Sequence, residues 1–259
     1  MKSVLTIAGS DCSGGAGIQA DIKTLTMHKV FATSVITSVT AQNTCGVTKV
    51  EPLSPEIIES QVSSVMEDIF PDAVKIGMLE SKENVEIIVK MLKKYAPKNI
   101  VVDTVMISSS GKRLLEENAM VVYTKELLPL AHIITPNIPE AEALTGRRIV
   151  NEEDTKEALK ELQERYQTAV LLKGGHATEH ANDWLSVNGE VICYPGRRFM
   201  NPNTHGTGCT LSSAIAANLA LGYSMEESVA RAKEYITGAI EAGLVLGKGN
   251  GPLNHMWHG

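Results

Sequence analysis

Six short apolar runs recur along the chain, each rich in Val and Ile and without alternation between apolar and polar positions. Such runs are typical of strands that are buried on both faces of a parallel sheet. The stretches between them carry apolar residues at helical spacing. The runs cover residues 4–8, 35–39, 73–77, 100–102, 132–134 and 169–172. This order predicts an α/β fold, with a mostly parallel central sheet and helices on both of its faces.

Capping signals mark the starts of three helices. Ser54 can cap a helix whose first position is Pro55, and the apolar residues that follow at helical spacing are Ile58, Val62, Val65, Met66 and Ile69. Asn151 can cap a helix that buries Leu159, Leu162 and Tyr166. Ser224 and Glu227 have the spacing of a capping box, which predicts the start of the last long helix.

A hairpin signal lies in the second half of the chain. Asn188-Gly189 separates two short strand-like runs, at residues 184–187 and 190–194, and this dipeptide favours a tight two-residue turn. We therefore expect an antiparallel edge on the C-terminal side of the sheet. No linker, low-complexity segment or obvious repeat interrupts the pattern, so we expect a single domain spanning residues 1–259.

Polar, small and charged residues follow each apolar run. In open α/β sheets, ligands bind beyond the carboxyl ends of the strands, so these residues are the first candidates for a shared site. They are Gly9 to Gly17, Thr40 to Thr44, Met78, Asp103, Thr135-Pro136-Asn137 with Glu140, and Lys173-Gly174-Gly175-His176. Any one of these stretches could be an ordinary turn, but six in register favour a common ligand site.

Composition and charge exclude several classes of protein. The formal net charge of −6 argues against nucleic-acid binding over a broad surface. No apolar run reaches the roughly 20 residues that cross a bilayer, and the N-terminus does not resemble a signal peptide. The four cysteines are scattered without a CxxC pair, which predicts free thiols in a reducing cytoplasm and no zinc site. They are Cys12, Cys45, Cys193 and Cys209.

Three common catalytic or cofactor motifs are missing or incomplete. Residues 15–20 match the dinucleotide pattern G-x-G-x-x-A, but no acidic residue between Asp21 and Glu51 is available to hold a ribose. The chain has neither the P-loop pattern nor the G-x-S-x-G elbow of serine hydrolases. The glycines of residues 14–17 form either a flexible strand-to-helix turn or a loop that lets the backbone approach a small ligand, with Asp21 in the first helical turn aimed at it.

The clearest chemical feature is the glycine-rich turn of residues 203–210, which leads into an Ala-rich helix. Backbone N–H groups at such a helix start, together with the helix dipole, form an anion site. Gly206, Thr207 and Gly208 would supply this site. Cys209 would lie at the same terminus, where we expect the pKa of its thiol to be lowered.

Three charged positions near the predicted sheet edge allow two interpretations each. Lys173 ends a buried strand and either meets an anion or is simply solvated. Asn137 and Glu140 open a helix after Pro136, where Glu140 either complements the helix dipole or, with Asn137, helps to bind Mg²⁺ through water. Asp103 ends another buried strand, where a carboxylate needs a metal ion or a hydrogen-bond donor.

Taken together, these stretches resemble the hydroxymethylpyrimidine/phosphomethylpyrimidine kinases of thiamine biosynthesis, which belong to the ribokinase-like superfamily. The most specific parts are the AGSD…SGGAGIQAD block and the GTGC helix start. The resemblance covers essentially the whole chain, through residues 6–11, 13–21, 41–44, 75–79, 135–140, 173–176, 203–210 and 249–255. It implies a three-layer ribokinase-like fold.

The resemblance also implies an activity and its site. The enzyme would use ATP and Mg²⁺ to phosphorylate 4-amino-5-hydroxymethyl-2-methylpyrimidine and then its monophosphate, as a cytoplasmic homodimer that binds neither nucleic acid nor membrane. Its catalytic cysteine would be Cys209, with Gly206, Thr207 and Gly208 as the anion hole. The other roles it implies are a pyrimidine pocket of Gly9, Asp21, Gln42 and Met78, nucleotide contacts from Lys173, Asn137, Glu140 and Thr204, and metal ligands Asp103 and Glu140.

Two positions depart from the pattern, and two other functions compete with this one. Ser109 stands where many relatives carry lysine, and Thr40 stands where an apolar residue often precedes Ala-Gln.

A pyridoxal kinase shares the scaffold and the GxGC turn, and dual activity is an option. A non-catalytic pyrimidine-binding sensor is the alternative from another class, although a mere binder would need neither Cys209 nor Lys173.

Overall fold

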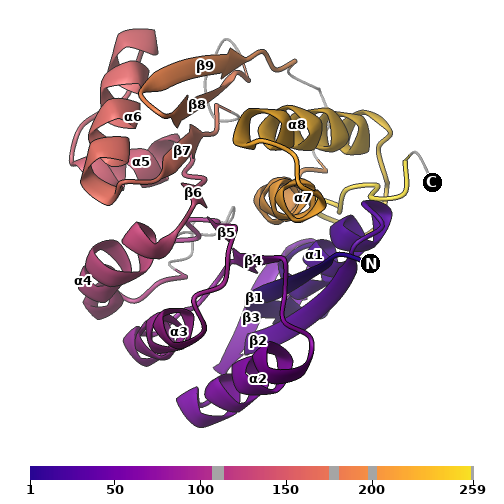
Figure 1. Cartoon of the computed structure of the whole chain (residues 1–259). Helices are drawn as coiled ribbons and strands as arrows, with labels where there is room; N and C mark the ends of the chain where they lie inside the picture. Colours follow the sequence, from indigo (N-terminus) through magenta and orange to yellow (C-terminus); the bar gives the residue numbers. More distant parts are fainter. Residues whose placement is uncertain (107–113, 175–180, 198–202, 258–259) are drawn as a thin grey trace.

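A single nine-stranded sheet organises the computed structural model, which describes residues 1–106, 114–174, 181–197 and 203–257. The strand order is β3-β2-β1-β4-β5-β6-β7-β8-β9 (Figure 1). Strands β2, β1, β4, β5, β6 and β7 run parallel, while β3 at one edge and β8 and β9 at the other are antiparallel. The chain order changes direction at β1, which pairs with both β2 and β4.

The strands are β1 (Ser3–Asp11), β2 (Phe31–Asn43), β3 (Gly46–Pro52), β4 (Ala73–Ile76), β5 (Ile100–Val102), β6 (Ile133–Ile134), β7 (Ala169–Leu172), β8 (Asp183–Val187) and β9 (Glu190–Tyr194). The principal helices are α1 (Gly17–Met27), α2 (Pro55–Asp68), α3 (Lys82–Tyr95), α5 (Ile138–Thr145), α6 (Glu152–Tyr166), α7 (Thr207–Leu221) and α8 (Met225–Glu241). Short helical turns follow one another as η1 (Glu117–Ala119), α4 (Met120–Val122), η2 (Tyr123–Leu127) and η3 (Leu128–Leu130).

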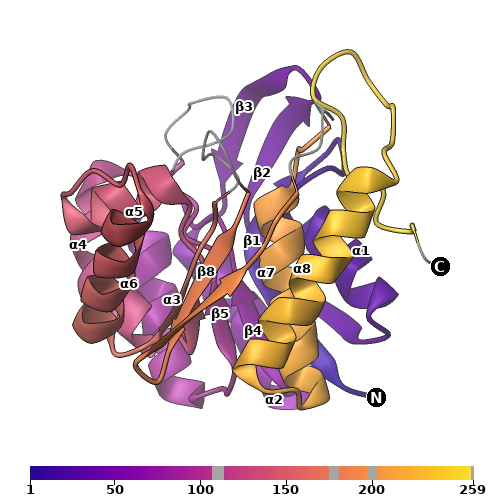
Figure 2. The same ribbon diagram turned by 90° about the horizontal axis from the view of Figure 1, so that it is seen from above.

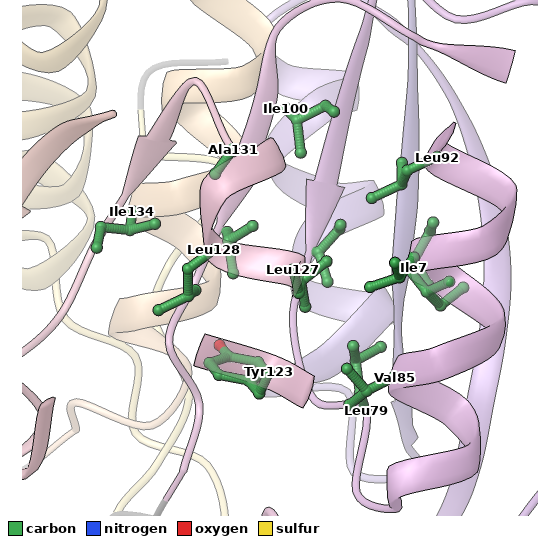
Figure 3. Close-up of a cluster of buried hydrophobic side chains, with 14 of the residues drawn as sticks. Ile7, Leu79, Val85, Leu92, Ile100, Tyr123, Leu127, Leu128, Ala131 and Ile134 are labelled. Atoms are coloured by element: carbon green, nitrogen blue, oxygen red, sulfur yellow. The ribbon is translucent and has the colours of Figure 1, made fainter. Parts of the chain in front are cut away.

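Two hydrophobic clusters sandwich the sheet, one on each face. Helices α7 and α8 cover one face together with α1, and α2 to α6 cover the other (Figure 2). Neighbouring residues of one strand enter opposite clusters: Val4 and Val101 face α7, while Leu5 and Val102 face the other side. Figure 3 shows part of the second cluster, where Tyr123 and Leu127 pack near Leu79. Burial on both faces explains why the strands read as unbroken apolar runs.

The structure confirms the predicted fold class and the positions of the strands, with two differences. Strand β2 extends well beyond the predicted residues 35–39, and β3 forms a second antiparallel edge that the apolar pattern did not predict. The C-terminal hairpin is as expected, with Asn188 and Gly189 at φ values of 52° and 81° in its turn. No helix in the described part of the chain is both long and apolar enough to cross a membrane.

The predicted caps also lie where expected. Asn151 and Ser224 form capping boxes with Asp154 and Glu227, which satisfies N–H groups at the starts of α6 and α8. Ser54 is the N-cap of α2, but its side chain makes no capping hydrogen bond. Pro55 occupies the first turn, so one of the N–H groups that would need a partner is absent.

Candidate active site

A cleft of about 770 Å³ lies along the carboxyl ends of the parallel strands. Residues that follow β1, β2, β4, β5, β6 and β7 all contribute to its lining, as the position of ligand sites in open α/β sheets predicts. The lining includes all but one of the residues that the sequence analysis proposed for the site: Gly9, Gln42, Met78, Asp103, Asn137, Glu140, Lys173, Thr204, Gly206, Thr207, Gly208 and Cys209. Asp21 is the exception.

The start of α7 forms one end of the cleft. Gly206 is the N-cap and has a φ of 86°, a left-handed conformation that glycine adopts readily. A Cβ atom on Gly206 would lie 1.9 Å from the carbonyl oxygen of Gly15, so only glycine fits between the two loops. Thr207 donates from its hydroxyl to the carbonyl of Thr204 at 2.6 Å, which closes the turn. The first N–H groups of α7 lie beside the cleft without a capping side chain.

Cys209 lies in the first turn of α7 and lines the cleft, but its thiol is not acidified. Burial raises its pKa to about 11, the ammonium of Lys75 opposes the rise, and the carboxylates of Asp21 and Asp103 add to it. The expectation of a lowered pKa is therefore wrong. Loss of solvation around the thiolate and two nearby negative charges outweigh the helix dipole and Lys75.

Asp21 is fully buried on α1 and does not line the cleft, contrary to the expectation that it faces the pyrimidine. Its two carboxylate oxygens accept hydrogen bonds from the ammonium of Lys75 at 2.8 and 2.9 Å. They also accept hydrogen bonds from the hydroxyls of Ser213 on α7 and Thr6 on β1, at 2.8 and 2.6 Å. Asp21 thus joins α1, β1, β4 and α7 below the cleft.

A second ion pair lies at the cleft wall. The ammonium of Lys173 donates to Oδ1 of Asp103 at 2.9 Å, and Thr135 donates to the same oxygen at 3.2 Å. Burial opposes ionisation of Asp103, but Lys173 and Lys75 outweigh it and lower the pKa of that carboxyl. A Cβ atom on Gly208 would lie 3.2 Å from Asp103 and 3.5 Å from Lys173, which places the pair beside the α7 start.

Glu140 serves two structural roles and faces the cleft. With Asn137 it forms a capping box at the start of α5, and the helix begins where the sequence predicted, with Glu140 in its first turn. Its carboxylate also accepts a hydrogen bond from the hydroxyl of Thr104 at 2.9 Å. Burial raises its pKa, Lys173 opposes the rise and Asp103 adds to it. Within the described residues, no group of three His, Cys, Asp or Glu side chains is arranged to hold a metal ion.

Gln42 also lines the cleft, within a network of side chains that reaches the approach to α7. Nε2 of Gln42 lies 3.0 Å from Nε2 of His205, and the hydroxyl oxygen of Thr40 lies 3.2 Å from the other terminal atom of the Gln42 amide. Nε2 of His205 lies 3.0 Å from a carboxylate oxygen of Asp11. The departure at Thr40 therefore places a polar hydroxyl next to Gln42 instead of an apolar side chain.

Three features of the site were missed from the sequence. Lys75 interrupts an apolar run, and a lysine inside a buried strand should have indicated a carboxylate partner. Asp11 and His205 belong to the recognised blocks but received no role, because the contact between them joins residues 194 positions apart. Arg197 also lines the cleft and carried no sequence signal. Ser109 and residues 175–180 lie outside the described residues.

Comparison with known proteins finds similarity along nearly the whole chain. The model of the phosphomethylpyrimidine kinase family matches residues 11–254. The hydroxymethylpyrimidine/phosphomethylpyrimidine kinase of Haemophilus influenzae is 46% identical, covering 98% of this chain and 97% of that protein. The thiamine biosynthesis bifunctional protein of Geobacter sulfurreducens is also 46% identical across 98% of this chain, but the chain spans only about half (52%) of its length.

Two solved structures share the architecture. The phosphomethylpyrimidine kinase of Clostridium difficile has a TM-score of 0.85 and 50% identity, covering 93% of this chain and 100% of that one. A pyridoxal kinase of Bacillus subtilis in complex with ADP has a TM-score of 0.91 at 35% identity, covering 98% and 97%. These likenesses confirm a ribokinase-like kinase fold. By sequence along nearly its whole length, the chain belongs to the phosphomethylpyrimidine kinase family.

Proposed function

We propose that this kinase transfers the γ-phosphoryl group of ATP to 4-amino-5-hydroxymethyl-2-methylpyrimidine and then to its monophosphate, for thiamine biosynthesis. The observation that carries the proposal is the composition of a single cleft. It combines a helix start without a capping side chain, Cys209, a lysine–carboxylate pair and the amide side chain of Gln42. An amide can pair with a ring nitrogen and its neighbouring amino group.

Phosphoryl transfer depends mainly on positioning and on stabilising charge. We assign the N–H groups around Gly208 to the migrating phosphoryl group and Lys173 to the neighbouring phosphate oxygens. Lys173 donates to Asp103, and phosphate oxygens would compete with that carboxylate for the three donors of the ammonium. Cys209 is the group we assign to accept the proton of the substrate hydroxyl.

The elevated pKa of Cys209 constrains this role. A thiol with a pKa of about 11 is protonated at neutral pH, so a thiolate must form as substrates enter and change the local charge. Two carboxylates raise that pKa, and Lys75 is the cation that lowers it. We therefore expect ligands that neutralise Asp103 to favour the thiolate, because they remove one of the charges that oppose it.

The donor set fits Mg²⁺ only in its usual phosphate-bound form. Mg²⁺ is often held by one or two carboxylates together with phosphate oxygens and water, and does not need a cage of protein ligands. Asp103 and Glu140 both line the cleft, and each keeps oxygen lone pairs beyond the hydrogen bonds described above. Mg²⁺ would neutralise phosphate charge there, while Lys173 and the α7 start hold the remaining oxygens.

An ADP-release assay with three acceptors tests the proposal. The purified protein is given ATP and Mg²⁺ with hydroxymethylpyrimidine, with its monophosphate, or with pyridoxal. We expect turnover of both pyrimidines. The likeness to a Bacillus subtilis pyridoxal kinase is the observation that favours pyridoxal as a second acceptor. Turnover of pyridoxal alone would contradict the assignment, and binding without turnover would favour the sensor alternative.

We further propose that the chain is a single domain and works as a cytoplasmic homodimer, as its family resemblance implies. All four cysteines are free thiols, which is compatible with a reducing compartment. Light scattering of the eluting protein, at micromolar concentration, tests the dimer: we expect about twice the mass of 27.9 kDa. One cooperative thermal transition, at a single midpoint by fluorescence and by circular dichroism, tests the single domain.

A further inference from the structure

Four side chains along the cleft wall form a continuous chain of polar contacts. Nε2 of His205 lies 3.0 Å from Oδ2 of Asp11 and 3.0 Å from the amide of Gln42. At the far side of this amide, the hydroxyl of Thr40 lies 3.2 Å away, and it also donates to the carbonyl of Ser10 at 3.0 Å. The chain therefore links the end of β1, the end of β2 and the approach to α7.

Asp11 determines where His205 carries its proton. The carboxylate already accepts hydrogen bonds from the N–H groups of Ser13, Gly15 and Ala16 and from the Ser13 hydroxyl. Burial alone would raise the pKa of Asp11. Hydrogen bonds from His205, Ser13 and Ala16 outweigh that effect and lower the pKa to about 2. An ionised carboxylate can only accept, so Nε2 of His205 must donate to it. The other tautomer would set a ring lone pair against a negative charge.

The proton on Nε2 of His205 determines the orientation of the Gln42 amide. A ring nitrogen that bears a hydrogen cannot accept a hydrogen bond from the amide N–H, so the Gln42 amide must turn its oxygen toward His205. The two ends of an amide have nearly the same shape, and the same atom positions accommodate this orientation. The amide nitrogen then lies 3.2 Å from the Thr40 hydroxyl oxygen, which can accept because its own proton goes to Ser10. Every donor in the chain then has an acceptor.

We propose that His205 is a positioning residue that sets ligand specificity, because its protonated Nε2 disfavours the amide N–H₂ of Gln42 and favours the amide oxygen beside it, which fixes the amide in one orientation. The held amide keeps one N–H and one oxygen lone pair for a ligand. It therefore selects rings whose edge places an acceptor nitrogen beside an amino donor, as in a 4-aminopyrimidine. A pyridine ring of the pyridoxal type has no amino group beside its nitrogen and satisfies only half of the amide. The inference rests on the proposed function, since it takes Gln42 to contact the pyrimidine.

The surroundings of His205 keep its ring in place. A Cβ atom on Gly15 would lie 2.4 Å from Cδ2 of His205, so the ring packs directly on a glycine backbone. The N–H of His205 donates to the carbonyl of Gly251 at 3.3 Å. The ring is 15% exposed, so little space is left for alternative positions. A test must therefore preserve the size of this side chain and change only its donor.

Two variants separate the donor from the shape. His205→Phe keeps a planar ring and removes the N–H, whereas His205→Gln keeps an N–H donor at about the same distance from the backbone. Calorimetry without ATP measures the affinity for hydroxymethylpyrimidine and for its analogue without the 4-amino group, and steady-state kinetics gives kcat and both KM values. We expect the parent to bind the amino compound about tenfold or more tightly than the analogue, because the analogue leaves part of the Gln42 amide buried without a hydrogen-bond partner.

His205→Phe should reduce that preference to about twofold and leave the KM for ATP within about twofold, and His205→Gln should restore most of the preference. An undiminished preference in His205→Phe would overturn the proposal. So would equal losses in both variants when their thermal stability matches the parent, because shape alone would then explain the effect. Should His205→Phe fail to fold, Thr40→Val removes the acceptor on the other side of the amide and must lower the preference for the proposal to stand. A parent that does not phosphorylate hydroxymethylpyrimidine refutes the proposed function, whatever the variants do.

Discussion

Lys75 and Asp21 form a fully buried ion pair beneath the start of α7. Burial opposes the charged form of Lys75, but the carboxylate beside it raises its pKa above the usual value. Two hydroxyls complete the coordination of the carboxylate, from Ser213 and Thr6. Such a pair is costly to break, because removing one partner leaves an uncompensated charge in the interior.

We predict that Lys75→Met lowers the free energy of unfolding by about 3–5 kcal/mol, since Asp21 would remain buried without its cation. Urea denaturation measures this change. Lys2→Met is the matched control, because Lys2 pairs with Asp72 at the surface, where its side chain is 51% exposed. Exposed pairs contribute about 0–1 kcal/mol. Equal losses in the two variants would contradict the role given to the buried pair.

At the scale of elements, the C-terminal segment of residues 249–257 holds α7 in position. His205 donates from its backbone to Gly251, and Asn203 accepts from the N–H of Gly251 at 2.8 Å. Nε2 of His255 lies 3.0 Å from the hydroxyl of Thr210 in the first turn of α7. The helix start that we assign to phosphate is therefore held by the C-terminal segment as well as by the Lys75–Asp21 pair.

The burial of His255 predicts a pH dependence of stability. Loss of solvation lowers its pKa from the ordinary 6.5 to about 4, with a further lowering by Lys23. As the pH falls, the unfolded chain binds a proton at His255 before the folded protein does. Its contribution to stability is therefore complete above pH 6.5 and is lost between pH 6.5 and pH 4. A shift of this size corresponds to about 3 kcal/mol.

Urea denaturation of the parent and of His255→Gln at a series of pH values measures this effect. The stability of the parent should fall more steeply than that of His255→Gln between pH 6.5 and pH 4, and the two slopes should agree above pH 7. Parallel curves over the whole range would show that His255 does not contribute this dependence.

Strands that are buried on both faces could be predicted from the sequence, whereas strands at an exposed edge could not. Strands β4, β5 and β7 have apolar residues on both faces, and their positions followed from the sequence almost to the residue, although Lys75 interrupts β4. Strand β3 has no fully buried residue, and β2 beyond Thr40 pairs only with β3, so neither carried an apolar signal. A strand that is stabilised by main-chain hydrogen bonds at an exposed edge has no apolar pattern to reveal it.

The candidate site followed a different logic. The edge of the sheet at which it lies could be predicted from topology, and so could the start of α7, because glycine spacing and strand order are local or general properties. The pKa of Cys209 and the burial of Asp21 could not, because both depend on Lys75 and on residues far apart in the chain. The motifs identified the candidate side chains, but only the packing of the folded chain shows which of them line the cleft.

At the scale of the whole molecule, the cleft carries several carboxylates in a chain of net charge −6. We expect phosphate binding to need an added cation, so excess EDTA should abolish turnover and Mg²⁺ should restore it. Asp103→Asn should raise the Mg²⁺ concentration that gives half-maximal rate. Asp68→Asn, an exposed carboxylate on α2, is the control and should not change it. Full turnover in excess chelator would refute the metal assignment.

The central claim is that Cys209 takes the proton of the substrate hydroxyl at the start of α7, and the kcat of Cys209 variants tests it most directly. General-base help is worth about 10²–10⁴-fold, so Cys209→Ala should lower kcat by at least about 10²-fold while pyrimidine affinity stays within about threefold. Cys209→Asp should recover part of the rate because a carboxylate can also accept the proton, and Cys209→Ser should be slower than Cys209→Asp. If folded Cys209→Ala turns over at the rate of the parent, Cys209 is only a packing residue and the account of this site is wrong.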